Sequence, residues 1–365
     1  MKKLINYLKK LPKESWRCFA RYYNVGRWHK ALVFVVIAVS ACLGIMYGIA
    51  RWYIAQHNNE PVTLGTSFIP AYAESLGLDA KETMDALIKD IGIRHFRLVS
   101  YWDQLEPEKG KYDFRLLDWQ FAKAENAGAK VTLSLGLRQP RWPECHMPGW
   151  AENQSVNEWQ PQLEKFIAAV VSRYKSSPAL ESYQLENEFF LKGFGNCKNF
   201  DRSRLISEAT IVKELDPWHE LIISRSNNAI GMPIGAPTPD EYGISIYKRV
   251  WDATLTKRYL EYPFPAWYYA FVAGTQKIIT GKDMIIHELQ AEAWPPNGKF
   301  ITDISLEEQN KSFNAERFRD RIEFGKATGM REIYLWGSEY WYYRKVVEKD
   351  PSLWLVAKDA FHENQ

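Results

Sequence analysis

Short apolar runs rich in β-branched residues recur along the chain from residue 62 onward, separated by longer segments with helical spacing. Each run has the length of a buried strand, and the segments between them repeat apolar residues three and four positions apart, as amphipathic helices do. We expect strands over residues 62–67, 93–99, 130–135, 182–187, 221–224, 242–247, 284–289 and 332–336. We expect helices over residues 79–91, 114–127, 156–175, 203–215, 255–279, 306–328 and 351–361.

The order of these elements predicts an α/β fold, a closed (β/α)₈ TIM barrel. Strands that alternate with helices form parallel sheets through right-handed crossovers, and eight such units are the number that closes this barrel. Asp79, with Glu82 three residues later, has the capping-box arrangement of a helix start. The fifth unit is the least regular, because residues 229–239 are rich in Gly and Pro. Active sites of such barrels lie at the carboxyl ends of the strands.

A long apolar segment precedes the predicted barrel. Residues 31–50 contain no charged side chain and are long enough for one transmembrane helix. Residues 1–30 carry nine Lys or Arg against one acidic residue, so the positive-inside rule places this arm in the cytoplasm and the barrel outside it. We therefore predict a single-pass membrane protein made of a basic arm (1–30), a transmembrane anchor (31–50), a linker (51–60) and a barrel domain (61–365).

The charge of the chain is divided between the arm and the barrel. The whole chain carries +3 and its first thirty residues contribute +8, so the remainder carries −5. This division favours contact of the arm with a lipid bilayer and argues against nucleic-acid binding by the barrel. The sequence contains no P-loop, no Gly-x-Gly-x-x-Gly, no His-Glu-x-x-His and no Gly-x-Ser-x-Gly motif. We predict neither a cofactor nor a metal ion.

The cysteines allow more than one interpretation. The segment ending at Cys42 resembles a bacterial lipoprotein cleavage box, but the apolar run continues beyond it, which favours an uncleaved anchor. A lipoprotein modified at Cys42 stays the alternative, and both forms tether the barrel outside the cytoplasm. Cys145 and Cys197 each follow a predicted strand, so they are either a disulfide in an oxidising compartment or two free thiols.

Two carboxylates stand at the ends of predicted strands that face each other across the barrel. Glu188 closes the fourth strand, and Glu288 lies at the end of the seventh. Retaining glycosidases need one protonated carboxyl, which assists the leaving oxygen, and one ionised carboxylate, which attacks the anomeric carbon. Asn187, beside Glu188, is placed to donate to the 2-hydroxyl of the sugar. The pair therefore predicts cleavage of a glycosidic bond in an oligo- or polysaccharide.

Other polar residues at strand ends extend this candidate site. Arg97 ends the second strand, where a guanidinium would keep the nucleophile ionised, and Tyr247 ends the sixth, where its hydroxyl would bind the same carboxylate. Glu292 lies four residues after Glu288 and is a possible alternative nucleophile. Tryptophan rings on this face are candidates for stacking on sugars, with Trp336 the strongest and packing roles equally open for Trp142, Trp150, Trp294 and Trp341.

Three stretches resemble the large clan of retaining glycoside hydrolases built on (β/α)₈ barrels, and the motifs are most similar to its β-galactosidase-like families. Gln184-Leu185-Glu186-Asn187-Glu188 is similar to the Gln-x-x-Asn-Glu end of their fourth strand. Residues 102–118 look like the segment after their second strand, and Pro140-Arg141-Trp142 looks like their third-strand loop. The resemblance runs in order through residues 62–340.

This resemblance implies that Glu188 is the acid/base and Glu288 the nucleophile. Many members have Pro after the acid/base and Gly shortly after the nucleophile, whereas this chain has Phe189 and Gln290-Ala291. A membrane anchor is also not a usual part of the pattern. We expect a membrane-anchored retaining β-glycosidase that works by double displacement. A transglycosylase that builds a surface glycan, and a decayed barrel that serves as a glycan-binding or envelope scaffold, are the alternatives.

Overall fold

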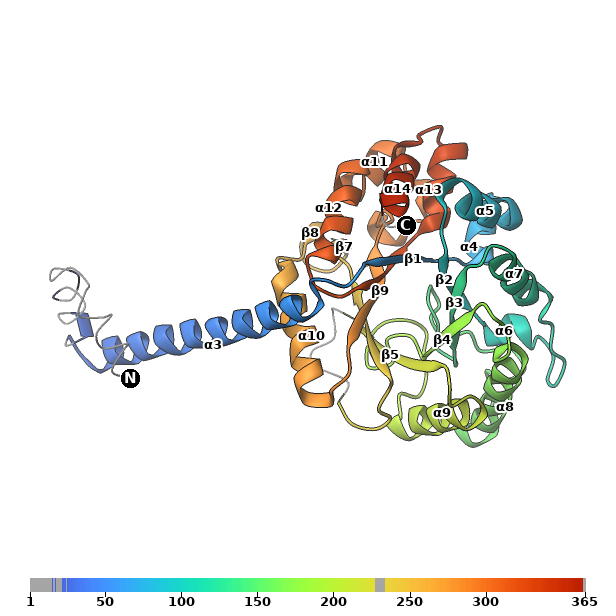
Figure 1. The fold of residues 1–365 in the computed structure, drawn as a ribbon, viewed down its shortest axis with the longest axis horizontal. Helices are drawn as coiled ribbons and strands as arrows, with labels where there is room; N and C mark the ends of the chain where they lie inside the picture. Colours follow the sequence, from blue (N-terminus) through green and yellow to red (C-terminus); the bar gives the residue numbers. More distant parts are fainter. Residues whose placement is uncertain (1–14, 16, 18–21, 24, 227–233, 364–365) are drawn as a thin grey trace.

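Eight parallel strands form a closed barrel in the order β1-β10-β9-β6-β5-β4-β3-β2, with helices around it (Figure 1). The computed structural model describes residues 15, 17, 22–23, 25–226 and 234–363. The predicted (β/α)₈ barrel is confirmed. Its strands are β1 (Thr63–Ser67), β2 (His95–Val99), β3 (Lys130–Leu135), β4 (Leu180–Leu185), β5 (Glu220–Ser226), β6 (Glu241–Ile246), β9 (Met284–Gln290) and β10 (Glu332–Trp336).

Helices connect the strands and cover the outside of the barrel. One long helix, α3 (Arg27–His57), precedes it. The remaining described helices are α4 (Pro70–Ser75), α5 (Ala80–Ala86), η1 (Leu87–Ile91), α6 (Trp102–Leu105), α7 (Arg115–Asn126), α8 (Val156–Tyr174), α9 (Arg202–Leu215), α10 (Ala266–Thr280), η2 (Pro296–Gly298), η3 (Ile301–Asp303), α11 (Leu306–Ser312), α12 (Ala315–Lys326), α13 (Ser338–Val346) and α14 (Ser352–Glu363).

Side chains rather than solvent fill the middle of the barrel. The Tyr334 ring crosses it from β10, and its hydroxyl and that of Ser182 each lie 2.9 Å from Thr132 Oγ1. Gly65 of β1 makes room for this ring, because a Cβ at Gly65 would lie 2.6 Å from ring carbons of Tyr334. Packed layers of this kind leave one open end for ligands, at the carboxyl ends of the strands.

Two predicted helices differ from the structure for local reasons. Residues 255–265 are not helical, because β7 (Arg249–Asp252) and β8 (Arg258–Glu261) form an antiparallel hairpin there. Pro263 and Pro265 follow it, and proline disfavours helix in the residue before it. The predicted helix over 306–328 breaks into α11 and α12, because the Asn314 side chain accepts a hydrogen bond from Arg317 N at 2.9 Å and caps a new helix.

The fourth strand ends two residues earlier than predicted. β4 stops at Leu185, and Glu186 and Glu188 adopt the left-handed region, with φ of 50° and 46°. Such φ values cost about 1–3 kcal/mol each for residues other than glycine and collect at functional sites. The chain therefore turns sharply where the sequence predicts chemistry.

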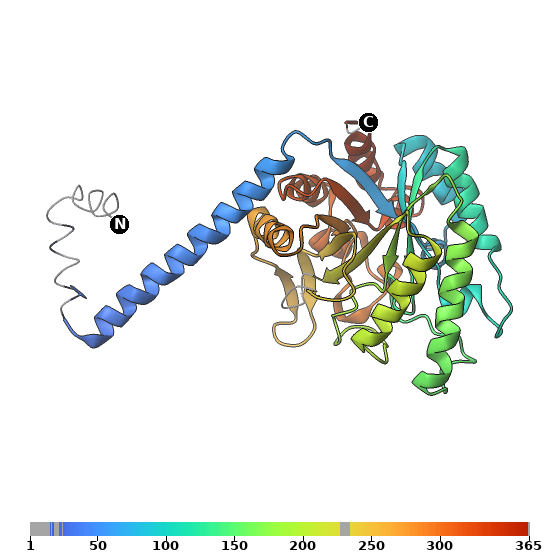
Figure 2. The same cartoon turned by 60° about the horizontal axis from the view of Figure 1, so that its bottom comes forward.

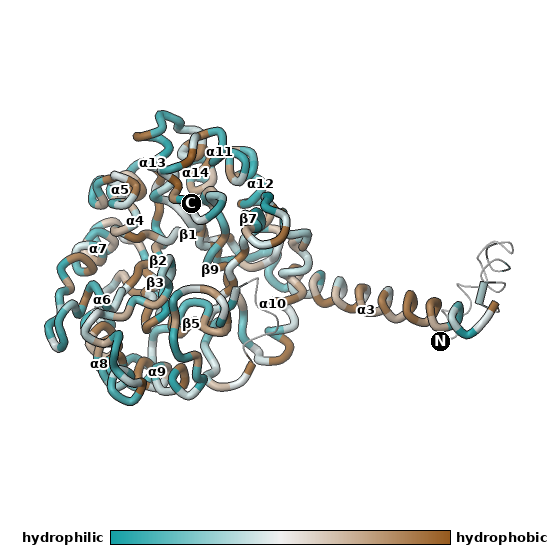
Figure 3. The backbone as a smooth tube through the Cα atoms, turned by 180° about the vertical axis from the view of Figure 1, so that it is seen from behind, coloured by the Kyte–Doolittle hydropathy of each residue, from teal (hydrophilic) through white to brown (hydrophobic). Residues whose placement is uncertain are grey.

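The apolar helix α3 is longer than the predicted anchor and continues into the predicted linker. It stays helical to His57, and it is long and apolar enough to cross a membrane (Figure 3). Ala50, Tyr53 and His57 are buried, and α3 packs closely against α10. A Cβ on Gly274 of α10 would lie 3.0 Å from Tyr53, so the two backbones approach tightly there. Most of the predicted basic arm, and residues 229–233 of the irregular fifth unit, lie outside the described residues.

Candidate active site

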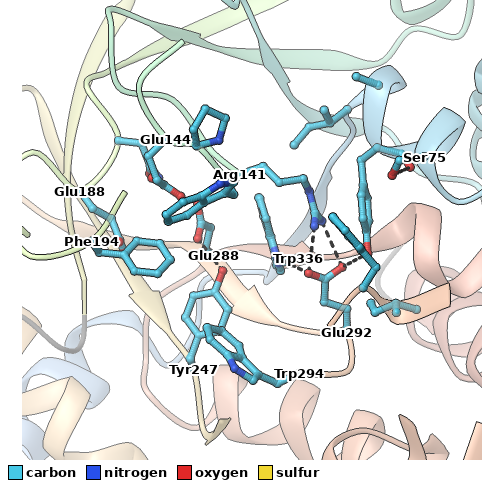
Figure 4. A pocket seen from close by; sticks show the side chains of 18 of the residues that line it. Ser75, Arg141, Glu144, Glu188, Phe194, Tyr247, Glu288, Glu292, Trp294 and Trp336 are labelled. Atoms are coloured by element: carbon cyan, nitrogen blue, oxygen red, sulfur yellow. Dashed lines mark hydrogen bonds and ion pairs between the residues drawn. The ribbon is translucent and has the colours of Figure 1, made fainter. Parts of the chain in front are cut away.

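A pocket of about 610 Å³ opens at the carboxyl ends of the barrel strands. Loops after nearly every strand contribute to it, and Figure 4 shows Glu144, Glu188 and Glu288 toward one side and Glu292 toward the other. This is the end of the barrel where the sequence places the site. The predicted site residues that line the pocket are Trp142, Asn187, Glu188, Tyr247, Glu288, Glu292, Trp294 and Trp336.

Glu288 lies near the end of β9 at an irregularity in the sheet. Ile244 of β6 pairs with Ile286 of β9, but the next residue of β6, Ser245, pairs with Glu288. β9 therefore carries one extra residue at this point. Such a bulge re-aims the side chains beside it, often next to an active site. The Glu288 carboxylate accepts hydrogen bonds from Arg97 Nη1 at 2.7 Å and from the Tyr247 hydroxyl at 2.8 Å.

Arg97 ties the two candidate strands together from inside the barrel. Besides its ion pair with Glu288, it donates from Nη2 to Asn187 Oδ1 at 2.9 Å and from Nε to the Gln184 side chain. The Arg97 side chain is 0% exposed and that of Glu288 is 5% exposed, so water hardly screens their attraction. Arg97 and Tyr247 together fix the position of the Glu288 carboxylate at the mouth of the barrel.

Asn187 and Glu188 are held by the turn that follows β4. The Asn187 backbone donates to Arg138 O at 2.7 Å, and the Glu188 backbone donates to Ser224 Oγ at 3.0 Å. Asn187 Oδ1 accepts from both Arg97 and Gln184, which orients the amide nitrogen toward the pocket side, 3.3 Å from Glu144 Oε2. The site thus presents one amide donor beside one carboxyl group.

The Glu188 carboxyl occupies a very different environment from that of Glu288. Burial, and after it the negative charge of Glu288, raises the pKa of Glu188 to about 7. Its Oε1 atom is buried without a hydrogen-bond partner among the described residues. The two neighbouring carboxyl groups thus differ in their surroundings: Glu288 is ion-paired with Arg97, whereas Glu188 is buried without such a partner in the part of the chain that the structure describes and has a raised pKa. Different environments of two nearby carboxyl groups are typical of acid/base pairs in enzymes.

Glu186 has a supporting role behind the pocket. Its carboxylate accepts from Arg204 Nη1 at 2.7 Å and from the backbone nitrogens of Leu137 and Arg138 at 2.6 and 3.1 Å. Gly136 leaves the space for it, since a Cβ there would lie 2.4 Å from Glu186 Oε1. These bonds hold the turn after β4 in its left-handed conformation.

Glu292 is bound into a separate cluster on the other side of the pocket. Its carboxylate accepts from both terminal nitrogens of Arg141 at 3.2 and 3.1 Å, from Tyr72 at 3.0 Å and from Trp336 Nε1 at 2.8 Å (Figure 4). The Arg141 guanidinium also lies over the rings of Tyr72 and Trp336. Both carboxylates are thus ion-paired, but only the charge of Glu288 is close enough to raise the pKa of Glu188, which favours Glu288 as its partner.

The tryptophans divide into pocket walls and packing residues. Trp336 is nearly buried and presents its ring edge to Glu292, and Trp294 meets the Tyr247 ring edge-on at 5.7 Å between centroids. Trp142 is 62% exposed at the pocket rim. Trp150 and Trp341 are absent from the lining and donate to the backbone carbonyls of Glu106 and Ala291.

Glu144 is a pocket carboxyl that the sequence analysis missed. Burial raises its pKa to about 8, against the lowering effect of Arg138, and the charges of Glu188 and Glu288 raise it further. It follows the Pro140-Arg141-Trp142 motif by two residues, so that motif is the signal that could have led to it. A protonated Glu144 adds a further hydrogen-bond donor to this side of the pocket.

A disulfide joins Cys145 to Cys197, with an S–S distance of 2.12 Å. It links the loop after β3, which carries Arg141 and Glu144, to the loop after Glu188. Of the two interpretations of these cysteines, the structure has the bonded one. Within residues 25–226 and 234–363, no three His, Cys, Asp or Glu side chains lie close enough together to hold a metal ion.

Comparison with known proteins confirms the resemblance to glycoside hydrolases. The Glyco_hydro_42 family model, described as Beta-galactosidase, matches residues 77–203. The mannan endo-1,4-beta-mannosidase A of Podospora anserina is 34% identical over 153 residues, covering 40% of this chain and 39% of that protein. The probable mannan endo-1,4-beta-mannosidase F of Aspergillus flavus is 29% identical over 142 residues, covering 37% of this chain and 30% of that protein.

Solved structures agree with the fold. The GH5_18 protein of Streptomyces cattleya in complex with GlcNAc matches with a TM-score of 0.55 at 12% identity, covering 76% of this chain and 70% of that one. This chain spans only 30% to 39% of the two mannosidases named above. In its barrel, its pocket and these partial matches the chain is similar to the barrel glycoside hydrolases.

Proposed function

We propose that this protein is a retaining glycoside hydrolase that cleaves a β-glycosidic bond, with Glu188 as acid/base and Glu288 as nucleophile. The observation that carries the proposal is the contrast between the two carboxyl groups. Arg97 and Tyr247 bind the Glu288 carboxylate at 2.7 and 2.8 Å, whereas burial and the charge of Glu288 raise the pKa of Glu188 to about 7. Double displacement requires this division of roles.

In the first step, a Glu288 oxygen forms a bond to the anomeric carbon while the bond from that carbon to the leaving oxygen breaks. Glu188 gives its proton to the leaving oxygen, which departs as an alcohol. The product is a glycosyl ester of Glu288 with inverted anomeric configuration. Arg97 and Tyr247 orient the attacking carboxylate, at 2.7 and 2.8 Å.

In the second step, water attacks the anomeric carbon and the ester bond to Glu288 breaks. Glu188, now ionised, takes a proton from that water, so both carboxyl groups return to their starting states. Asn187 Nδ2 donates to the 2-hydroxyl, a contact that strengthens in the transition state. Trp336, Trp294 and Trp142 provide apolar walls for sugar rings on both sides of the reacting centre.

The names of the relatives favour a β-linked hexose glycan as the substrate class. The matching family model is described as Beta-galactosidase and the two fungal relatives as mannan endo-β-mannosidases. Galactose and mannose differ in the orientation of the 2-hydroxyl and the 4-hydroxyl, which the polar side chains of the pocket would distinguish. A pure scaffold is disfavoured, because binding alone has no need of two opposed carboxyl groups in such different surroundings.

We also propose that α3 anchors the enzyme in a membrane, with the barrel outside the cytoplasm. The described part of α3 before residue 47 exposes a continuous apolar surface, and the basic residues of the arm precede it. The disulfide between Cys145 and Cys197 agrees with an oxidising compartment. The chain would thus have the arm 1–30 inside, the anchor within the bilayer and the domain 61–365 outside.

Covalent labelling tests the assignment of the nucleophile. A 2-deoxy-2-fluoro β-glycoside with an activated leaving group forms the ester but hydrolyses slowly, so it accumulates on the nucleophile. We expect peptide mapping by mass spectrometry to find the label on Glu288. A label on Glu292 would transfer the nucleophile to that residue, and inactivity toward a full panel of aryl β-glycosides would contradict the proposed activity.

The raised pKa of Glu188 predicts a pH limit on activity. Glu188 must hold its proton for the first step, so kcat/KM should fall as pH rises through about 7, roughly tenfold for each further pH unit. Activity below this limit is retained, since a group with a raised pKa stays protonated there. A pH profile of kcat/KM that stays level to pH 9 in the wild-type protein would contradict the assignment.

Tyr247→Phe tests the hydrogen bond at 2.8 Å to Glu288. A hydrogen bond to a charged group contributes about 1.5–3 kcal/mol, so kcat/KM should fall about 10- to 100-fold. Tyr259→Phe is the matched control, because Tyr259 donates to the Glu308 carboxylate at 2.9 Å away from the pocket. Equal kinetic losses in both variants would show that the Tyr247 hydroxyl has no special role.

A further inference from the structure

The direction of α3 relative to the barrel is fixed by its contacts. Near its carboxyl end, Tyr53 donates to Met284 O, and His57 lies 3.2 Å from Asp283, both at the start of β9. Ile54 packs against Gly329, just before β10. The carboxyl end of α3 therefore lies at the amino edge of the barrel, opposite the pocket.

Ten residues earlier in the chain, α3 lies at the opposite edge of the barrel, where the pocket opens. Tyr47 contacts the ring of Trp267, in the first turn of α10, at 5.8 Å between centroids. α10 begins after the β7–β8 hairpin at the pocket edge and descends to β9 at the amino edge. Since Tyr47 meets the start of α10 and His57 lies within 3.5 Å of Lys277 near its end, the apolar part of α3 projects beyond the pocket edge.

No spacer separates this projecting part from the barrel. The nineteen residues from Trp28 to Met46 rise about 28 Å as a helix, close to the thickness of a bilayer hydrocarbon core of about 30 Å. The next residue, Tyr47, already contacts the barrel. A bilayer crossed by this segment would begin at the level of the barrel rim, and Figure 2 shows α3 leaving toward the side where the β7–β8 hairpin lies.

The tip of this hairpin is suited to contact with lipid. Leu255 is 90% exposed, and the Asp252 carboxylate accepts from the backbone nitrogens of Leu255 and Thr256, so an ordered turn presents the leucine. Lys257 and Arg258 are exposed beside it. An apolar tip flanked by cations matches the boundary between acyl chains and headgroup phosphates.

The rim of the pocket is also apolar. Phe300 is 75% exposed, Trp142 62% and Phe194 40%. All three line the pocket, as does Val250 of the hairpin itself. Apolar side chains thus form part of the pocket rim, and the β7–β8 hairpin contributes Val250 to that rim.

We propose that the pocket is turned toward the bilayer, with the tip of the β7–β8 hairpin seated in its surface, and that the substrate is a glycan carried by a membrane lipid. The proposal rests on the glycosidase activity and the membrane crossing proposed above. The lipid part of the substrate remains among the acyl chains, the apolar rim receives the segment nearest the lipid, and the sugar enters between Glu188 and Glu288. Confinement to one membrane raises the effective concentration of such a substrate.

The orientation is tested first without catalysis. An environment-sensitive fluorophore is attached at Leu255→Cys in the full chain, with Cys18 and Cys42 changed to serine, in vesicles of phosphatidylethanolamine and phosphatidylglycerol. Leu355→Cys is the matched control, because Leu355 is 54% exposed and belongs to α14, which lies far from the hairpin (Figure 2). We expect a blue shift and quenching by spin-labelled lipid at residue 255 alone. Equal, water-like spectra at both positions would overturn the proposal.

The substrate class is tested with one sugar on two aglycones. The same β-hexoside is offered as a soluble aryl glycoside and as a dialkylglycerol glycoside in the vesicles. Leu255→Asp should lower kcat/KM for the lipid glycoside about tenfold or more and leave the soluble one unchanged, whereas Leu355→Asp should change neither. Equal effects of Leu255→Asp on both substrates would overturn the lipid assignment. No turnover of either substrate by the wild-type chain would instead refute the glycosidase activity, while the fluorophore still reports the orientation.

Discussion

Glu188→Gln should lose kcat/KM about 10²- to 10⁴-fold on glycosides with poor leaving groups and far less on activated aryl glycosides. The amide keeps the shape of the side chain but has no acidic proton for the leaving oxygen. Dinitrophenolate departs without that help, so the first step survives and the intermediate accumulates, because no base then activates water. The measurement is a series of aryl glycosides with leaving groups of graded pKa, together with the pH profile.

Glu144→Gln is the control for this prediction, since Glu144 is also a buried carboxyl of the same pocket with a raised pKa. Its replacement should leave the dependence on the leaving group as in the wild type. The alkaline limit near pH 7 should vanish in Glu188→Gln for activated substrates and persist in Glu144→Gln. A uniform loss over all leaving groups in Glu188→Gln would mean that Glu188 is not the proton donor.

Glu288→Gly should lower turnover by about four orders of magnitude or more, because the covalent step loses its nucleophile. The shorter side chain leaves room beside Arg97 and Tyr247 for a small anion, which these two donors would bind. Azide should therefore restore turnover of an activated β-glycoside and yield the α-glycosyl azide. Product analysis by NMR gives the anomeric configuration directly.

Glu292→Gly is the matched control for azide rescue. Glu292 is bound by Arg141, Tyr72 and Trp336, so its removal opens a similar space in the opposite wall of the pocket. The activity of Glu292→Gly should not respond to azide, because an azide ion bound in the place of the Glu292 carboxylate would not be positioned to attack the anomeric carbon. Rescue in Glu292→Gly and none in Glu288→Gly would reverse the assignment.

The alternation of strand and helix patterns along the chain was enough to predict the barrel and to place the polar residues that end its strands. Alternating strands and amphipathic helices imply a parallel barrel, and the carboxyl edge of that barrel collects whatever residues end its strands. Arg97, Asn187 and Glu288 could be brought together on this ground alone, and the structure joins them through one guanidinium. Tyr247 follows the same rule.

Features set by distant contacts could not be predicted in this way. The pairing of Glu292 with Arg141 joins residues 151 positions apart, and no spacing in the sequence indicates it. The extra residue in β9 is defined only against its neighbours β6 and β10. The left-handed turn at Glu186 depends on Arg204 and on backbone groups of another loop, so β4 ended earlier than its apolar pattern predicted.

Because α3 passes without interruption into the barrel wall, the proposed anchor and the barrel are not separable modules. Ala50, Tyr53 and His57 belong to the packing around α10, with Gly274 fitted against this helix. A protease that cut after residue 57 would remove α3 from the barrel. The apolar surface of α10 that α3 covers would then be exposed to water, and the product would be prone to aggregate. A form of the barrel released from the proposed anchor would have to keep the last three turns of α3.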